Sequence, residues 1–295
     1  MCTIFGIGIC KLLVTCSNVN GGLYVLDVKE ENYQLTKLLT NNCRGIARWG
    51  EHFVMATYDE INLVDANGRI LLRSQRTPLD YHGVFVHNNK AYIVETRTNS
   101  IGIFNPLTLT REDEIRFSQE NRDIHHINDL WIHGNRLFLS MFSLETEWRS
   151  TEGPSGVVLE YCLDKGQITH IHDQKLSKPH TVILGEDGLY YCNSLEFEVK
   201  KDKEAIFRCN GFTRGMEISG EVLFIGQSVT KKITVAHEKD IRHHLNVSLD
   251  SGIHVLDRVN KVSMMIPIPD SQPYCLLMVD KKEDKIRSTH SSTPS

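Results

Sequence analysis

The stretch HGVFVHNNKAYIVET, residues 82–96, decides the fold of this chain. Two apolar runs rich in β-branched and aromatic residues flank a polar turn that contains two asparagines, which is the pattern of an antiparallel β-hairpin. The same form recurs as RGIARWGEHFVMATY (44–58), NDLWIHGNRLFLSMF (128–142), HTVILGEDGLYYCNS (180–194) and RGMEISGEVLFIGQS (214–228). A hairpin that occurs five times indicates a protein built from repeated β units.

Each hairpin is followed by further strands. A third strand is predicted at segments such as SIGIFNP, GVVLEYC and GIHVLDR, and a fourth usually follows, as in EIRFS, QITHIH and KVSMMIPIP. Helical periodicity is nearly absent. Four antiparallel strands that recur at roughly 35 to 60 residues are typical of propeller blades. We therefore predict an all-β chain that forms a β-propeller with four-stranded antiparallel blades.

The two ends of the chain supply one more blade. KLLVTCSN (11–18), GGLYVLDV (21–28) and YQLTKLLT (33–40) have the pattern of second, third and fourth strands, and PYCLLMVD (273–280) that of an inner strand. A blade shared between the termini closes the ring at six and removes exposed sheet edges. The role of residues 2–9 stays open, because TIFGIGI competes for the same inner position. We expect one domain over residues 1–280 and a polar, disordered tail over 281–295.

Composition limits the partners. The 295 residues are 40% hydrophobic and 24% charged, with a net charge of −4 and no basic block, which argues against nucleic acid or an anionic membrane surface as the main partner. The apolar start lacks a basic region and a cleavage site, and no segment reaches the length of a membrane span. The eight cysteines are scattered without a C-x-x-C pair. We expect reduced thiols and a cytoplasmic location.

Polar residues recur at equivalent places in the repeat. In a propeller the first strand of each blade lines the central channel, and the second strand returns to the face where the first began. The strand starts carry Arg44, His82, Asn128, His180 and Arg214, with Tyr274 or Cys275 in the shared blade. The hairpin ends carry Tyr58, Glu95, Ser143, Asn193 and Gln227. This convergence predicts a ligand site at one mouth of the channel.

Two long loops open on the same face. They connect second and third strands over residues 144–156 and 228–252. Irregular stretches of that length in a compact domain are usually lids or binding loops, although a tolerated surface insertion has the same appearance. A protein partner could also dock on these loops.

The residue types at the mouth suggest acid–base chemistry on an anion. Guanidinium groups form paired hydrogen bonds with carboxylate, phosphate or sulfate, so Arg44 and Arg214 are expected to bind a small anionic molecule. We expect His82, His126, His180 and Glu95 to transfer protons, with Glu95 pairing to His82. The ligand would be oriented by Asn128, Asn193, Gln227 and Tyr58. This arrangement would serve a lyase, isomerase, cyclase or hydrolase without a required cofactor.

Two alternatives remain open. His82, His180 and one of His125 and His126, with His126 preferred, could ligate zinc, iron or copper. Glu95 would be a fourth ligand or would hydrogen-bond to one, although two nearby arginines would repel the cation. The chain could instead be a non-catalytic propeller that senses an acidic metabolite or presents its loops to a protein partner.

Three segments also resemble a known family. GFTRG (211–215), KPHTVILGEDGLYYCNS (178–194) and the PY pair at 273–274 resemble a family of bacterial six-bladed propeller proteins of largely undefined function. The broader architecture is similar to gluconolactonase and strictosidine-synthase relatives. Their calcium-type sites use carboxylates and asparagines on inner strands, and this sequence departs from that pattern. The resemblance implies the fold and brings no reaction with it.

Overall fold

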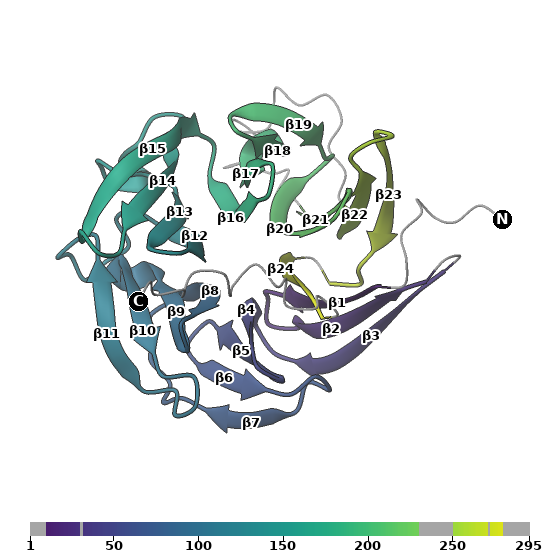
Figure 1. Cartoon of the computed structure of the whole chain (residues 1–295), viewed down its shortest axis with the longest axis horizontal. Coiled ribbons are helices and arrows are strands. Elements are labelled where there is room, and N and C mark those ends of the chain that lie inside the picture. The colour runs from purple at the N-terminus through teal and green to yellow at the C-terminus, as the bar shows by residue number, and fades with distance from the viewer. Residues whose placement is uncertain (1–9, 30–31, 230–249, 271, 280–295) are drawn as a thin grey trace, which may run out of the picture.

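The computed structural model describes residues 10–29, 32–229, 250–270 and 272–279. Within these ranges the chain forms six four-stranded sheets arranged around a central axis, as Figure 1 shows. Every pairing between neighbouring strands is antiparallel, as between β1 and β2 or between β8 and β9. The predicted six-bladed β-propeller is confirmed.

The blades follow one another along the chain, and each runs from an inner to an outer strand. The second blade contains β4 (Cys43–Trp49), β5 (His52–Thr57), β6 (Ile61–Val64) and β7 (Ile70–Arg73). The third contains β8 (Tyr81–His87), β9 (Lys90–Glu95), β10 (Ser100–Phe104) and β11 (Arg111–Arg116). The fourth contains β12 (Ile127–His133), β13 (Arg136–Met141), β14 (Gly156–Cys162) and β15 (Gln167–Leu176). The fifth contains β16 (Pro179–Gly185), β17 (Gly188–Asn193), β18 (Glu198–Lys201) and β19 (Glu204–Arg208). The sixth contains β20 (Phe212–Ser219), β21 (Val222–Ser228), β22 (Gly252–Asp257) and β23 (Val262–Pro267).

The first blade joins the two ends of the described chain. Its inner strand β24 (Pro273–Met278) pairs with β1 (Cys10–Cys16), which is followed outward by β2 (Gly22–Val28) and β3 (Tyr33–Thr40). Leu13 lies opposite Leu277 in this pairing. The closure predicted from the terminal segments is therefore confirmed. Residues 2–9 and the tail 281–295 lie outside the described residues.

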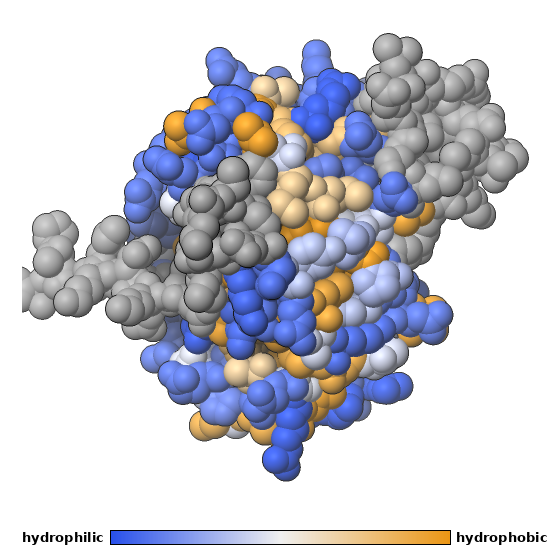
Figure 2. Space-filling view, turned by 90° about the vertical axis from the view of Figure 1, so that its right-hand side faces the viewer, coloured by the Kyte–Doolittle hydropathy of each residue, from blue (hydrophilic) through white to orange (hydrophobic). Residues whose placement is uncertain are grey.

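The hydrophobic core lies between the blades. Among the described residues, six buried apolar clusters form, one at each boundary between neighbouring blades. Phe53, for example, packs between the first and second blades, and Tyr190 between the fifth and sixth. The outer strands are more exposed, and hydrophilic and hydrophobic residues mingle over the outer surface seen in Figure 2. This packing fixes the blades to one another and holds the inner strands around the axis.

The cysteines behave as small apolar residues. The seven that the structure describes are free, and all but Cys275 are buried. Burial raises the pKa of Cys192 and Cys275 to about 12. These thiols are therefore protonated and suited to packing rather than to nucleophilic attack.

Helical structure in the described ranges is short: η1 (Thr96–Thr98), η2 (Trp148–Ser150) and η3 (Ser194–Glu196) are 3-10 turns. No helix in these ranges has the length and apolar character needed to cross a bilayer.

Candidate functional site

Irregular strand pairing directs one polar residue from each blade toward the axis. In the third blade Tyr81 lies opposite Glu95 while Val84 lies opposite Ile93, so two residues, His82 and Gly83, share one partner position. Such a bulge bends the strand and re-aims its side chains. The other five inner strands have the same irregularity at the equivalent position. The residues at the six bulges are Arg44, His82, Asn128, His180, Arg214 and Tyr274.

Small residues beside the bulges allow the inner strands to approach one another. A Cβ on Gly83 would lie 2.3 Å from Oδ1 of Asp129 in the next blade, and a Cβ on Gly45 would lie 2.4 Å from the carbonyl oxygen of His82. Both distances are shorter than carbon–oxygen contacts allow. The Arg-Gly and His-Gly pairs of the repeat therefore combine a polar side chain at the axis with a tight junction between blades.

His82 is buried in a polar network that spans the channel. Its Nδ1 lies 2.6 Å from the Tyr274 hydroxyl and 3.1 Å from Oδ1 of Asn128, and its Nε2 lies 3.6 Å from Oδ1 of Asp80. Burial, assisted by the charge of Arg44, lowers the pKa of His82 to about 3. The ring is therefore neutral at physiological pH.

Arg44 is paired with a carboxylate. Its Nη1 donates to Asp80 Oδ1 at 2.5 Å and to the Tyr81 carbonyl at 2.8 Å, and its guanidinium lies 5.2 Å from the Tyr58 ring. Burial alone would raise the pKa of Asp80, but contacts with His82 and Arg44 outweigh it and lower the pKa well below the ordinary range. The charge of Arg44 is thus largely balanced inside the protein.

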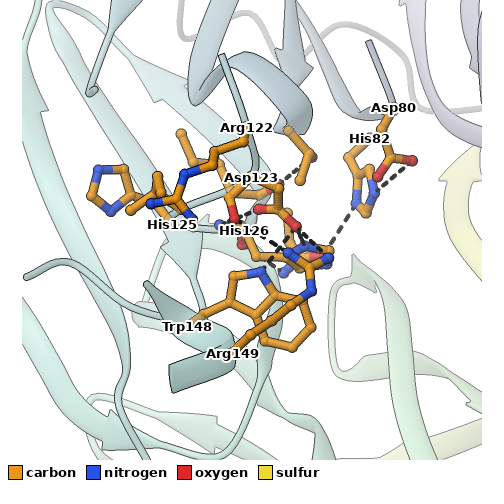
Figure 3. Close-up of polar contacts among 12 residues, drawn as sticks. Asp80, His82, Arg122, Asp123, His125, His126, Trp148 and Arg149 are labelled. Carbon is orange, nitrogen blue, oxygen red and sulfur yellow. Dashed lines mark hydrogen bonds and ion pairs between the residues drawn. The ribbon is translucent and has the colours of Figure 1, made fainter. Parts of the chain in front are cut away.

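His126 forms a dyad with Asp123. Its Nδ1 lies 2.7 Å from Asp123 Oδ2, and its backbone N–H donates to Asp123 Oδ1 at 2.9 Å. The same carboxylate accepts from Trp148 Nε1 at 2.9 Å and pairs with Arg149 at 3.1 Å, as Figure 3 shows. His126 has a left-handed backbone with φ of 47°. Such conformations are uncommon outside glycine and are held in place by surrounding contacts.

The His126 ring connects the channel to the loop over residues 144–156. It lies edge to face with His82 at a centroid distance of 5.3 Å, 4.3 Å from the Phe142 ring and 4.7 Å from the Trp148 ring. The loop predicted to lie on this face therefore does so, with Trp148 of η2 against the site. Of the second predicted loop, 228–252, residues 230–249 lie outside the described part of the chain.

His180 lies on the other side of Phe142. Its Nδ1 lies 2.9 Å from both the Lys178 carbonyl oxygen and the Ser194 hydroxyl, while its Nε2 is buried without a hydrogen-bond partner. Burial, with the charge of Arg214 next in importance, lowers the pKa of His180 well below its usual value. This imidazole is also neutral at physiological pH.

Arg214 is the unbalanced charge of the site. Its guanidinium lies 4.9 Å from the Phe212 ring and 5.6 Å from the Tyr274 ring, and its Nε is buried without a partner. Within the described ranges it makes no ion pair with a carboxylate. Burial lowers the pKa of Arg214, although a guanidinium stays charged at physiological pH.

Three predicted site residues point elsewhere. Glu95 does not pair with His82: its carboxylate accepts from Ser100 Oγ at 2.8 Å and Arg111 Nη2 at 2.6 Å within the third blade. Asn193 accepts from the Ser177 backbone at 2.7 Å. Side chains alternate in direction along a strand, and at the ends of these hairpins the alternation directs Glu95 and Asn193 into the blade. Their contacts therefore stabilise loops and outer strands.

Gln227 has a similar position in the sixth blade. Its Oε1 lies 3.0 Å from His254 Nε2 and accepts from the Asn210 backbone at 3.0 Å. Its amide nitrogen donates to the Asp250 carbonyl at 3.0 Å. All of its polar atoms are therefore engaged by the blade itself.

A cavity adjoins the channel cluster at the fourth and fifth blades. Its volume is about 490 Å³, and its walls include Phe142, Trp148, Arg149, Lys178 and Glu196. Phe142 connects the two regions, because it lines the cavity and its ring lies 5.3 Å from that of His180. The polar channel residues are themselves mostly buried, with His180 only 3% exposed. The cavity is therefore open space beside the buried polar residues of the channel.

A metal site finds no geometric support here. Within the described ranges no three His, Cys, Asp or Glu side chains are arranged to hold a metal ion. His82 and His126 approach edge to face, and the Nδ1 atoms of His126 and His180 are already engaged. The three histidines predicted as ligands are brought into one region without converging on one point.

The sequence pattern missed Asp80, Asp123, Phe142 and Trp148, and it left Tyr274 undecided against Cys275. Asp80 lies just before β8 with a left-handed backbone, φ 56°, so strand alternation could not have placed it beside His82. The role of Trp148 depends on how a long loop folds back, which no local pattern encodes.

The comparisons with known proteins identify a family. A family model described as a domain of unknown function, DUF4915, matches residues 72–267. The chain belongs to the DUF4915 family. A comparison with curated proteins found no match.

Solved structures share the fold of this DUF4915 member. A protein of unknown function from Bacteroides caccae has a TM-score of 0.64 at 10% identity, with 93% of this chain and 100% of that one covered. A chain of a Nidogen/Laminin complex has a TM-score of 0.64 at 10% identity, covering 91% and 97%. Regucalcin from Agrobacterium tumefaciens, a calcium-binding protein, has a TM-score of 0.55 at 11% identity, covering 79% and 76%. At these identities the likeness extends to the fold alone.

Proposed function

We propose that this chain binds a small anionic molecule at the mouth of its channel and acts on it by proton transfer. The guanidinium of Arg214 carries the proposal, because the residue is partly buried, its Nε fully so, and it has no carboxylate partner among the described residues. Burying an unpaired charge costs several kcal/mol in proteins, and an anionic ligand would repay that cost. Arg44 would shape the mouth rather than bind the anion, because Asp80 balances its charge.

Proton transfer would fall to the imidazoles. Neutral rings at His82 and His180 carry a lone pair that can accept a proton, and the negative charge of a ligand on Arg214 would raise the pKa values that burial and the arginines lower. Asp123 orients His126 and would stabilise its charged form, as a carboxylate does beside a catalytic imidazole. These groups would serve a lyase, isomerase, cyclase or hydrolase. The chain shares its fold with a luciferin-regenerating enzyme, at a TM-score of 0.57 and 10% identity over 79% of this chain and 78% of that one, and this likeness supports the proposal at the level of the scaffold.

We also propose a cytoplasmic location, which the free cysteines of the described chain support because a reducing compartment keeps thiols free. Its proposed partner is the anionic ligand itself.

Isothermal titration calorimetry with inorganic phosphate and a series of small mono- and dicarboxylates tests the proposal. Arg214→Gln should weaken binding by about 10- to 100-fold, the range expected for hydrogen bonds to a charged group. Arg69→Gln is the matched control, since Arg69 is exposed in the turn between β6 and β7 at the opposite end of the blades. Anion binding that is equal in the two variants would refute the proposal.

A further inference from the structure

The hydrogen-bonding capacity of the site identifies a class of ligand more narrowly than its charge does. His180 is the first part of the evidence. A carbonyl oxygen can only accept, so the contact with the Lys178 carbonyl at 2.9 Å requires a proton on Nδ1 of His180. The Ser194 hydroxyl agrees with this assignment, because it donates to the Thr213 carbonyl at 2.7 Å and leaves its oxygen free to accept from Nδ1. In the neutral ring Nε2 is then a bare acceptor.

His126 has the same tautomer for a different reason. Its Nδ1 faces the carboxylate of Asp123 at 2.7 Å. Although burial opposes it, contact with His126 and other donors lowers the pKa of Asp123, so the carboxylate is ionised and accepts only. When neutral, His126 therefore also carries its lone pair on Nε2. Both imidazoles lie against Phe142, with ring distances of 4.3 Å and 5.3 Å.

Arg214 is a hydrogen-bond donor, whereas Nε2 of each histidine is an acceptor. A guanidinium offers donors only, and Nε of Arg214 is buried without an acceptor. Phe212 contacts both Arg214, at 4.9 Å, and His180, at 5.2 Å. An unsatisfied cationic donor and an unsatisfied neutral acceptor thus contact the same aromatic ring, and the charge of Arg214 acts on the His180 imidazole.

We infer that the ligand is a hydroxy acid whose carboxylate pairs with Arg214 and whose hydroxyl donates to Nε2 of His180. The inference rests on the proposed function, since it concerns the same site. A plain carboxylic acid would leave the His180 acceptor unsatisfied, at a cost that proteins usually avoid. An amino acid would carry its ammonium group into a mouth that already contains Arg214 and Arg44.

The tautomers are tested first, without any ligand. Long-range ¹H–¹⁵N NMR of the histidine side chains in the full chain should show His180 and His126 protonated on Nδ1 at neutral pH. A proton on Nε2 of His180 would remove the acceptor and overturn the inference.

Matched pairs of acids then test the ligand class. Calorimetry with malate against succinate, and with lactate against propionate, compares acids that differ by one hydroxyl. We expect the hydroxy acid of a pair to bind at least about tenfold more tightly, because one satisfied hydrogen bond in a buried site has that effect. His180→Phe should abolish this preference and retain the binding of succinate, with thermal unfolding used to confirm that the variant folds.

The outcomes separate the two proposals. Equal binding within both pairs that still depends on Arg214 would overturn the hydroxy-acid inference and leave the anion site standing. Binding of inorganic phosphate with no binding of the four acids would overturn only the hydroxy-acid inference. An absence of binding for phosphate and all four acids, or binding that ignores Arg214→Gln, would overturn the proposed function and this inference with it.

Discussion

Replacing His82 by glutamine should change how the stability of the protein depends on pH. Burial lowers the folded-state pKa of His82 to about 3 from an ordinary 6.5. Because the folded-state pKa lies below the unfolded-state pKa, the stability that His82 contributes is fully present at pH values above the unfolded-state pKa. It is lost as pH falls, because the unfolded chain binds a proton that the folded chain does not. Between about pH 7.5 and about pH 5 the loss from this one group is roughly 2 kcal/mol, from 1.5 pH units at 1.36 kcal/mol each.

The difference between variant and parent isolates this contribution. Asp129 acts in the opposite sense, since burial raises its pKa to about 7 and a raised pKa stabilises the folded state as pH falls. The pH dependence of the parent's stability therefore sums these opposing effects. The Asp129 contribution cancels when His82→Gln is compared with the parent, and the His82 contribution remains. Urea denaturation at the two pH values provides the measurement, and His133→Gln, at an exposed position, is the control. If His82→Gln loses as much stability as the parent between these pH values, the buried neutral imidazole is not present.

Three further substitutions test the contacts around the axis. Gly83→Ala should destabilise the fold by about 1 to 3 kcal/mol in urea denaturation, because the new methyl group would meet Asp129; unchanged stability would contradict the tight junction. Glu95→Gln should lower stability by about 1 to 3 kcal/mol through its weakened contact with Arg111 and leave anion affinity unchanged; a loss of affinity measured by calorimetry would restore Glu95 to the site. Tyr274→Phe should cost about 1 kcal/mol in urea denaturation by removing a buried hydrogen bond, and a stability equal to the parent's would contradict that bond.

The repeat predicted more of the fold than of the site. Equivalent positions in five hairpins were enough to place Arg44, His82 and Arg214 at one end of one channel, since strand order and direction follow from the repeat. The repeat did not predict the hydrogen-bond partners of these residues. Glu95 ends the hairpin that His82 begins, yet its carboxylate turns into the blade, while Asp80 supplies the acid beside His82.

The reason is that bulges change side-chain direction without changing residue type. A strict two-residue alternation assumes regular pairing, and every described inner strand breaks that pairing at its polar residue. The contact between Trp148 and His126 depends in addition on the path of a long loop. Sequence alone thus predicts which residues meet at the axis better than it predicts what each one contacts.

The two arginines that the repeat makes equivalent differ in their neighbours, and this difference yields a final prediction. Arg44 lies 2.5 Å from the carboxylate of Asp80, whereas Arg214 lies beside the rings of Phe212 and Tyr274 and has no carboxylate partner in the described part of the chain. Contacts between a cation and aromatic rings contribute about 0.5 to 2 kcal/mol, less than the several kcal/mol that burying an unpaired charge costs. Without ligand, Arg214→Gln should therefore be neutral or stabilising in urea denaturation.

Arg44→Gln should have the opposite effect. The substitution leaves the Asp80 carboxylate half-buried without its cation, and breaking a buried pair of this kind costs about 3 to 5 kcal/mol, a value that the partial exposure of Asp80 reduces. The two variants remove the same side chain from equivalent positions of the repeat, so each is the control for the other. If Arg214→Gln proves the more destabilising of the two, Arg214 serves the fold, and the argument that its charge awaits an anion fails.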